Sequence, residues 1–324
     1  MAGPDGEIVR RFAADLAALW PEAARRRDLR LGLAVSGGPD STALLLIAAA
    51  ALPGRIEAAT VDHRLRAGSA AEAKMVAGLC AELGVPQAIL DVDVAPGNLQ
   101  AQARAARYAA LAGWVEAQGL AALVTAHHAD DQAETLLLRL NRASGVAGLA
   151  GARARGQVPG SAIPLLRPLI GWRRAELAQV VADCGVAAAD DPSNQDDRFD
   201  RVRIRQALAD ADWIDVAAVA ASAGHIADAD AALDWAAARE HAECVTREGA
   251  GLTYRPRAPR AVALRVIARI VADLGCDSAR GGAVARVFDS LLAGQPASIG
   301  DLVARPLPSG WSFARTAVPR KISR

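Results

Sequence analysis

The chain has 324 residues, of which 52% are hydrophobic and 23% charged, and its formal net charge is +1. This length predicts two or three domains, and the apolar fraction is ample for a buried core. No basic region followed by an apolar stretch opens the sequence, and the longest apolar run, residues 42–52, is too short to cross a bilayer. The four cysteines form no Cys-x-x-Cys pair, as is usual for thiols in a reducing compartment. We therefore expect a cytoplasmic enzyme without a signal peptide or a membrane partner, and not a secreted, disulfide-bonded protein.

The small net charge hides an uneven distribution along the chain. Residues 251–324 carry 12 Lys and Arg against 4 Asp and Glu, whereas residues 1–250 carry 25 against 32. A basic segment behind an acidic body indicates a polyanionic partner that the basic segment holds. The alternative is a solvated charged surface with no partner.

Short apolar runs alternate with long alanine-rich helical patterns between residues 30 and 170. We expect strands at residues 31–35, 56–61, 88–92 and 121–125, with a weaker one at 163–166, and helices at residues 41–51, 69–83, 98–118 and 131–142. This alternation predicts an α/β fold with a doubly wound parallel sheet. Ligands bind such sheets at the carboxyl ends of the strands, so residues that directly follow the expected strands are the candidate site residues.

The second half of the chain has a different pattern. Residues 151–164 are rich in Gly, Ala, Arg and Pro, and we expect them to form a mobile loop. The elements expected after it are a helix at 172–184, one or two helices at 213–248, helices at 257–274 and 283–292, and a terminal hairpin at 299–315. We therefore predict a catalytic domain at residues 1–212 and a smaller, mainly helical domain at residues 213–324.

The loop after the first expected strand reads Ser36, Gly37, Gly38, Pro39, Asp40 and Ser41. Paired glycines allow positive φ and the close approach of an anion, and the following helix adds the free amides and the positive dipole of its first turn. The serine hydroxyls can donate to phosphate oxygens, and Asp40 can hold a divalent ion beside them. The Gly-Lys-Ser/Thr ending of a Walker P-loop is missing. We interpret the segment as a phosphate-binding loop of another type; the alternative is an ordinary strand-to-helix turn.

The segment after the fourth expected strand, residues 125–135, contains two histidines and three acids within eight positions. If a helix begins near Asp130, Asp131 and Glu134 share one face, and His127 lies at the end of the strand within reach of it. Two carboxylates and an imidazole in one crevice suit an ammonium group, a metal ion or both. The alternative is that Asp130 caps the helix and that His127 or His128 is a core residue.

Further candidates follow from position. Asp62 and His63 come directly after the second expected strand, where such folds contact a nucleoside. Arg104 and Arg107 share a face of the helix at 98–118, which taken alone indicates a solvated surface. Four arginines follow the turn at residues 189–194 and suggest a phosphate-grasping segment, namely Arg198, Arg201, Arg203 and Arg205.

Five segments occur in the order found in the tRNA(Ile)-lysidine synthases of the ATP pyrophosphatase (PP-loop) superfamily: residues 36–41, 61–66, 103–108, 125–135 and 191–194. The chain resembles that family over residues 28–210 and more loosely to its end. The first segment is typical of the whole superfamily, whereas its combination with the His-His-x-Asp-Asp-Gln-x-Glu-Thr run is much more specific. Two residues depart from the family pattern, because Arg64 and Ala143 stand where the family usually has glycine.

The resemblance implies an N-type ATP pyrophosphatase domain with a Rossmann-like sheet and a ligase activity. The implied reaction uses ATP, Mg²⁺ and free lysine to convert the wobble cytidine of the CAU anticodon of tRNA(Ile) to lysidine, releasing AMP and pyrophosphate. It also implies a cytoplasmic protein, and a homodimer is the assembly we expect. The implied ATP contacts are residues 36–41, Asp62 and His63; the implied catalytic residues are Asp40, which also holds Mg²⁺, Arg107, His127, Asp131 and Glu134.

Among these, Asp131 and Glu134 are expected on the lysine substrate, with His127 and Arg107 near the reacting phosphate. We expect Arg104, Arg201, Arg203 and Arg205 to contact the tRNA, with the basic C-terminal segment on its stem. The nearest alternative is another PP-loop tRNA enzyme such as a thiolase, which usually needs paired cysteines that this chain lacks. A non-catalytic nucleotide-binding module is the alternative from a different class.

Overall fold

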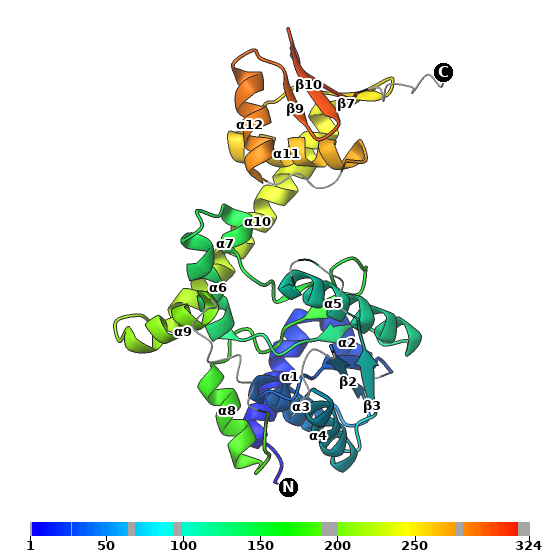
Figure 1. The fold of residues 1–324 in the computed structure, drawn as a ribbon, viewed down its shortest axis with the longest axis vertical. Helices are drawn as coiled ribbons and strands as arrows, with labels where there is room; N and C mark the ends of the chain where they lie inside the picture. The colour runs from blue at the N-terminus through cyan, green and yellow to red at the C-terminus, as the bar shows by residue number, and fades with distance from the viewer. Residues whose placement is uncertain are drawn as a thin grey trace. The chain divides into compact units, whose positions relative to one another are not determined.

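The computed structural model describes residues 2–26, 28–63, 69–93, 97, 99–189, 200–276 and 281–316. The chain forms two compact units, Met1–Ala227 and Asp228–Arg324 (Figure 1). The long helix α10 (Val216–Cys244) spans the division between them. Each unit is described by itself.

The first unit is built on a six-stranded sheet in the order β3-β2-β1-β4-β6-β5. All neighbouring strands are parallel except β5 and β6, which form an antiparallel edge pair. This confirms the doubly wound α/β fold, with the order of strands reversing beside β1. The strands are β1 (Leu31–Ala34), β2 (Ile56–Asp62), β3 (Gln87–Asp91), β4 (Leu123–Val124), β5 (Arg155–Gln157) and β6 (Pro164–Leu166).

The helices of this unit alternate with the strands as expected. The helices expected at 41–51, 69–83, 98–118, 131–142 and 172–184 are confirmed within three residues as α3 to α6 and α8. The expectation of a mobile loop at 151–164 is wrong, because β5 lies within it and pairs with β6. The helices are α1 (Gly6–Leu19), α2 (Pro21–Arg25), α3 (Pro39–Ala51), α4 (Ser69–Glu82), α5 (Leu99–Ala117), α6 (Ala129–Leu140), α7 (Val146–Leu149), α8 (Arg174–Asp183) and α9 (Asp200–Asp210).

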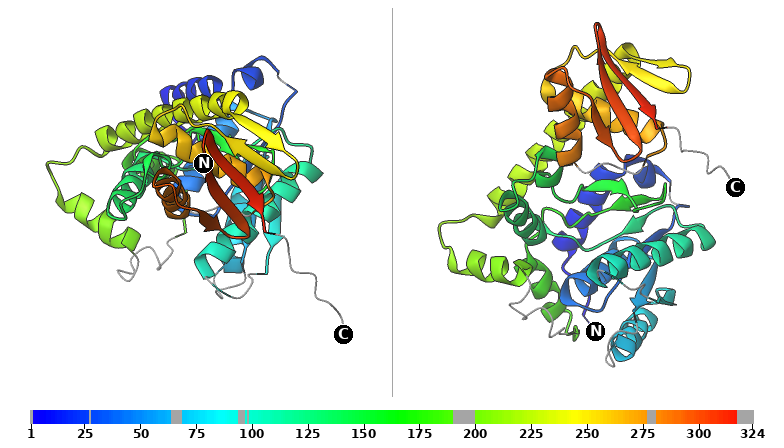
Figure 2. Two further views of the ribbon diagram at one scale, coloured as in Figure 1. Left: turned by 90° about the horizontal axis from the view of Figure 1, so that it is seen from above. Right: turned by 45° about the horizontal axis from the view of Figure 1, so that its top comes forward.

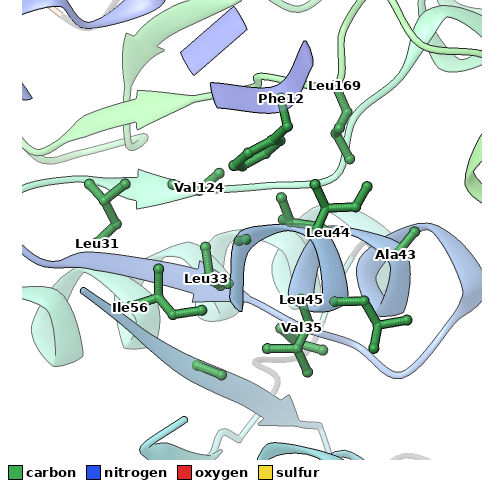
Figure 3. Close-up of a cluster of buried hydrophobic side chains, with 14 of the residues drawn as sticks. Phe12, Leu31, Leu33, Val35, Ala43, Leu44, Leu45, Ile56, Val124 and Leu169 are labelled. Carbon is green, nitrogen blue, oxygen red and sulfur yellow. The ribbon is translucent and has the colours of Figure 1, made fainter. Parts of the chain in front are cut away.

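The two faces of β1 pack against different helices because its side chains alternate in direction. Leu33 is fully buried in a cluster that also holds Phe12 of α1 and Leu44 of α3, and Figure 3 shows these side chains converging between the strands and α3. On the opposite face Gly32 faces Trp114 of α5, whose ring would lie 2.6 Å from a Cβ at that position. This close approach lets α5 cover the second face, and the loop after β1 is therefore fixed from both sides.

The second unit combines helices with a five-stranded antiparallel sheet in the order β7-β8-β11-β10-β9. Helices α11 (Arg260–Asp273) and α12 (Gly281–Leu292) confirm the two helices expected there. The expected terminal hairpin is confirmed as β10 (Leu302–Leu307) and β11 (Gly310–Arg315), drawn in red in Figure 2. The strands added to it, which the sequence pattern did not indicate, are β7 (Val245–Glu248), β8 (Gly251–Tyr254) and β9 (Ala297–Ile299).

The loop after α6 contains a backbone conformation that alanine rarely adopts. Ala143 has φ 49°, which lies in the left-handed region. The amide of Ser144 closes this turn by donating to the carbonyl of Arg139 at 3.0 Å. Glycine adopts this region without a steric cost, whereas alanine does not. A glycine at position 143 would therefore suit the turn better than the alanine of this chain.

Ala143→Gly should therefore stabilise the protein, by about 0.5–1 kcal/mol, because relief of the left-handed strain exceeds the added freedom of the unfolded chain. Chemical denaturation measures the free energy of unfolding. The matched control is Ala14→Gly in the exposed middle of α1, which should destabilise by about 1 kcal/mol. Destabilisation by both substitutions would contradict the strain argument.

Candidate functional site

A cavity of about 720 Å³ opens where β1, β2 and β4 end. Its walls come from the loop after β1, the segment after β4, and side chains of α4, α5, α8 and α9. The site therefore lies at the carboxyl edge of the parallel sheet, as the strand order predicts. Charged and hydroxylated side chains line much of it, which suits a polar, phosphorylated ligand.

The loop after β1 leaves the amino end of α3 open to this cavity. Gly38 is the N-cap residue and Pro39 the first helical residue, and no described side chain caps the helix. Ser41 instead closes the loop on itself, because its Oγ accepts from the amide of Ser36 at 3.1 Å and donates to the carbonyl of Gly38 at 3.0 Å. The uncapped helix end, with its partial positive charge, is therefore available to an anion.

Gly37 is required by this geometry. Its φ is 92°, and a Cβ at this position would lie 3.3 Å from Cγ2 of Val76. Its carbonyl accepts from the amide of Ala189 at 2.9 Å and from the hydroxyl of Thr42 at 3.2 Å. The loop is thus held from α3 and from the segment that follows α8, and it lies too close to α4 for a larger residue.

His128 connects this loop to the segment after β4. It is fully buried and is the N-cap of α6, since its Nδ1 accepts from the amide of Asp131 at 3.3 Å. Because Nδ1 accepts this bond, a neutral ring carries its proton on Nε2. Nε2 lies 3.3 Å from Oδ2 of Asp40 and 3.5 Å from Oδ2 of Asp131. Burial lowers the pKa of His128, but the nearby carboxylates of Asp40 and Asp131 outweigh it and raise the pKa above its usual value.

The interpretation of Asp130 as the N-cap is wrong, because α6 begins one residue earlier and His128 takes that role. Asp130 instead fixes the start of α8. Its carboxylate accepts from the guanidinium of Arg173 at 3.2 Å and from the amide of Arg174 at 2.8 Å. These bonds hold α6 and α8 together beside the cavity.

His127 lines the cavity and is kept neutral. Its Nδ1 lies 3.0 Å from the hydroxyl of Thr125. Burial and then the positive charges of Arg167, Arg104, Arg107 and Arg201 lower the pKa of His127 to about 3. A neutral imidazole with this pKa is a hydrogen-bonding group at physiological pH and a poor base.

Glu134 lies in a cluster of arginines rather than on the cavity wall. Its side chain is 1% exposed, and its carboxylate pairs with Arg174 at 3.0 Å, Arg205 at 2.8 Å and Arg201 at 3.3 Å. Burial favours the neutral acid, but the hydrogen bond from Arg205 and the charge of Arg174 outweigh it, so the pKa of Glu134 lies below its usual value. The structure thus separates Glu134 from Asp131, which lines the cavity.

The other predicted residues divide between the cavity and the surface. Arg201 and Arg205 of α9 line the cavity, whereas Arg203 is exposed and pairs with Asp200. His63 lines the cavity, and burial and the charge of Arg107 lower its pKa. Asp62 is buried at the end of β2 and is not among the lining residues. The predicted segments at 64–66 and 191–194, and Arg198, lie outside the described residues.

Arg104 and Arg107, on the helix face that taken alone indicated a solvated surface, both line the cavity. Their guanidinium carbons lie 4.9 and 5.3 Å from the ring centroid of Tyr108, which is 2% exposed. Sequence reasoning missed Tyr108, Arg174 and Glu72, which also line the cavity. Helical spacing shows that Arg104 and Tyr108 share a face, but no local signal brings Arg174 to this site.

The fit of a divalent cation rests on Asp40. Its Oδ1 is buried and has no hydrogen-bond partner among the described residues, and the carboxylate borders the open end of α3. The described residues form no cluster of three or more metal-ligating side chains. One carboxylate beside a phosphate site is nevertheless how proteins usually hold Mg²⁺, which retains waters and takes its other ligands from the phosphates.

The class of protein follows from a comparison of the sequence with known families. Residues 9–211 match the PP-loop domain. A solved structure with 12% sequence identity, the U34-tRNA thiolase NcsA from Methanococcus maripaludis with its [4Fe-4S] cluster, shares the fold with a TM-score of 0.55. The similarity covers 67% of this chain and 76% of that one. The first unit is thus a PP-loop, ATP-using domain.

Curated relatives define the family more closely. The tRNA(Ile)-lysidine synthase of Novosphingobium aromaticivorans is 48% identical over 97% of this chain and 95% of its own length. That of Zymomonas mobilis subsp. mobilis is 38% identical over 90% of each chain. The chain belongs to the tRNA(Ile)-lysidine synthase family. None of the helices in the described part of the chain combines the length and hydropathy needed to cross a membrane.

Glu134→Gln should destabilise the protein at pH 7 by about 3 kcal/mol, because it leaves three guanidiniums without their shared carboxylate. The pKa of Glu134 is lowered in the folded protein. The stabilisation that its charge gives is therefore complete above the ordinary pKa of glutamate, and it is lost as the pH falls through the pKa of the folded protein. The difference between variant and wild type should therefore shrink in acid, as measured by denaturant titration at pH 7 and pH 3. The control is Glu116→Gln on the exposed face of α5. A difference that stays constant with pH would contradict the pairing.

Proposed function

We propose that this protein ligates free lysine to C2 of the wobble cytidine of the CAU anticodon of tRNA(Ile), with ATP converted to AMP and pyrophosphate. The observation that carries the proposal is one cavity that joins an uncapped helix end to a carboxylate, a neutral imidazole and several arginines. The names of the curated relatives support the same substrate. A cytoplasmic location and a homodimer are part of the proposal.

In the first step the C2 oxygen of the cytidine attacks the α-phosphorus of ATP. A P–O bond forms to the nucleobase, and the bond to the β-phosphate breaks, so pyrophosphate leaves with its electron pair. The amides at the start of α3 and the hydroxyl of Ser36 stabilise the departing pyrophosphate, and Ser41 holds the loop in this shape through its bonds to Ser36 and Gly38. Asp40 is the residue that would hold Mg²⁺. When bound, the ion would supply positive charge that offsets the negative charge of the phosphates.

In the second step the lysine ε-amine attacks C2, the C–O bond to the adenylyl group breaks, and AMP leaves. The amine must lose a proton to solvent water before attack, because an ammonium has no free electron pair. Asp131 lines the cavity four residues after His127 and is the carboxylate that we assign to the lysine ammonium. Glu134, paired with three arginines, is assigned to holding Arg174, Arg201 and Arg205 at the cavity rather than to direct binding of lysine.

The tRNA contacts are assigned by charge and exposure. The anticodon nucleotide must leave its stack to reach the cavity, and Arg104, Arg201 and Arg205 line its walls. Arg201 and Arg205 are assigned to the backbone of this nucleotide, and Arg104 to the phosphate that joins its base to adenosine. Arg203, which is exposed, is assigned to the backbone outside it. The basic segment at residues 251–324 is assigned to the tRNA stem.

A thiolase is the alternative function within the same fold, since the solved structure that shares the fold is one. Its name includes an iron–sulfur cluster, and clusters of this kind are held by grouped cysteine thiolates. Here Cys80 and Cys184 are buried in the hydrophobic core of the first unit, and Cys244 and Cys276 belong to the second. This distribution favours lysine transfer over sulfur transfer.

The substrate assignment predicts that labelled lysine enters an unmodified tRNA(Ile) transcript with a CAU anticodon, only in the presence of ATP. The control is a methionine tRNA transcript with the same anticodon, which should take up none. The measurement is radiolabel in precipitated tRNA. Pyrophosphate release without lysine uptake would favour another PP-loop tRNA enzyme, and nucleotide binding without turnover would favour a binding module.

Asp40→Ala should reduce tRNA adenylation by about a hundredfold or more, because it removes the cation ligand beside the leaving pyrophosphate. Release of pyrophosphate in a single turnover, followed over a range of Mg²⁺ concentrations, measures this. Asp183→Ala at the end of α8 is the control and should behave as wild type. Full activity of the Asp40 variant would show that the assignment of the cation is wrong.

A further inference from the structure

Arg167 is a buried cation that the proposed reaction has not used. It directly follows β6, is 7% exposed, and its Nη1 donates to the carbonyl of Arg153 at 2.5 Å. Its Nε is buried and has no hydrogen-bond partner among the described residues. No ion pair within the described ranges involves Arg167, Arg104 or Arg107, although a buried charge is costly unless it is paired.

Tyr108 links this buried cation to the cavity. Its phenol interacts with Arg167 and Arg107, and its oxygen accepts a hydrogen bond from Arg104 at 3.4 Å. Arg104, Arg107 and Tyr108 line the cavity, whereas Arg167 is buried and is not a lining residue. One aromatic ring therefore connects a fixed guanidinium in the interior with two guanidiniums at the cavity wall.

The charges of this cluster act on the cavity together. His127 faces it and is held neutral by burial and by Arg167, Arg104 and Arg107, with Arg201 adding to them. The hydroxyl of Thr125 lies at Nδ1, so a neutral His127 that accepts this bond carries its proton on Nε2. Several cations and one neutral N–H donor, with no carboxylate of the described residues paired to Arg104, Arg107 or Arg167, make a wall that suits a phosphate group.

We propose that Arg167 is a positioning residue for the transferred phosphate: it fixes Tyr108, and Tyr108 holds Arg104 and Arg107 against the α-phosphate. This inference rests on the proposed function for the identity of the phosphate. It divides the cavity into two anion sites. The loop at 36–41 receives the departing pyrophosphate, and the wall built on Tyr108 receives the phosphate that stays with adenosine.

The division predicts different effects on two products. Arg167→Gln should weaken the binding of AMP by about tenfold, because the arginines that contact its phosphate lose their support. Binding of pyrophosphate, which belongs to the loop, should change by less than about twofold. Both affinities are measured by calorimetry on the full chain. Arg155→Gln is the matched control, since Arg155 lies on the neighbouring strand, pairs with Glu22 at the surface and has the same charge to lose.

A second readout separates positioning from a merely structural role. In Arg167→Gln the NMR titration of His127 should move to higher pH, because one of the charges that keep it neutral is gone. The single-turnover rate of tRNA adenylation should fall by about tenfold while the KM for ATP stays within about threefold. Tyr108→Phe, which removes only the hydroxyl, should weaken AMP binding in the same direction.

Wild-type affinity for AMP together with an unchanged titration of His127 in Arg167→Gln would overturn the inference. Should that variant fail to fold, Arg167→Lys and Tyr108→Phe test the inference instead, because both keep the charge of the cluster and disturb only its geometry. Wild-type affinity for AMP in both variants would overturn the inference. Should wild-type protein transfer no lysine, the proposed function fails, and dependence of AMP binding on Arg167 still supports the phosphate site.

Discussion

The parallel pairing of β1 with β4 is the constraint on which the site depends. Because Leu33 pairs with Val124, the loop after β1 and the segment after β4 leave the sheet at the same edge. His128 then lies 3.3 Å from Asp40, although the two residues are far apart in sequence. One buried imidazole thus connects the start of α3, where a phosphate can bind, with the start of α6, which carries Asp131.

Charge is organised around this junction in two ways. Glu134 is surrounded by Arg174, Arg201 and Arg205, so that α6, α8 and α9 are fixed by a buried ion cluster. Tyr108 is surrounded instead by guanidiniums with no carboxylate among the described residues. The first cluster contains its own carboxylate, whereas the second contains none among the described residues and therefore favours a bound anion. We therefore assign the cluster around Glu134 to holding the helices together and the cluster around Tyr108 to binding the ligand.

Much of the first unit was predictable because its signals are local. Apolar runs gave the central strands, and the glycines and serines at 36–41 identified the loop. Pairings across the sequence were not predictable: Arg205 reaches Glu134 from α9, and histidine is an unusual N-cap, so the role of His128 had no local signal. The short strands β5, β7 and β9 also escaped notice, because three or four residues of mixed polarity show no clear alternation. Their hydrogen bonds to neighbouring strands define them.

The central claim is that ATP is cleaved between its α- and β-phosphates while the nucleobase captures the adenylyl group. ³¹P NMR of a reaction with ATP, lysine and the CAU-anticodon tRNA(Ile) transcript tests this most directly, since each product has its own resonance. We expect AMP and pyrophosphate in equal amounts, formed only when tRNA is present. ADP and orthophosphate as the products would contradict it.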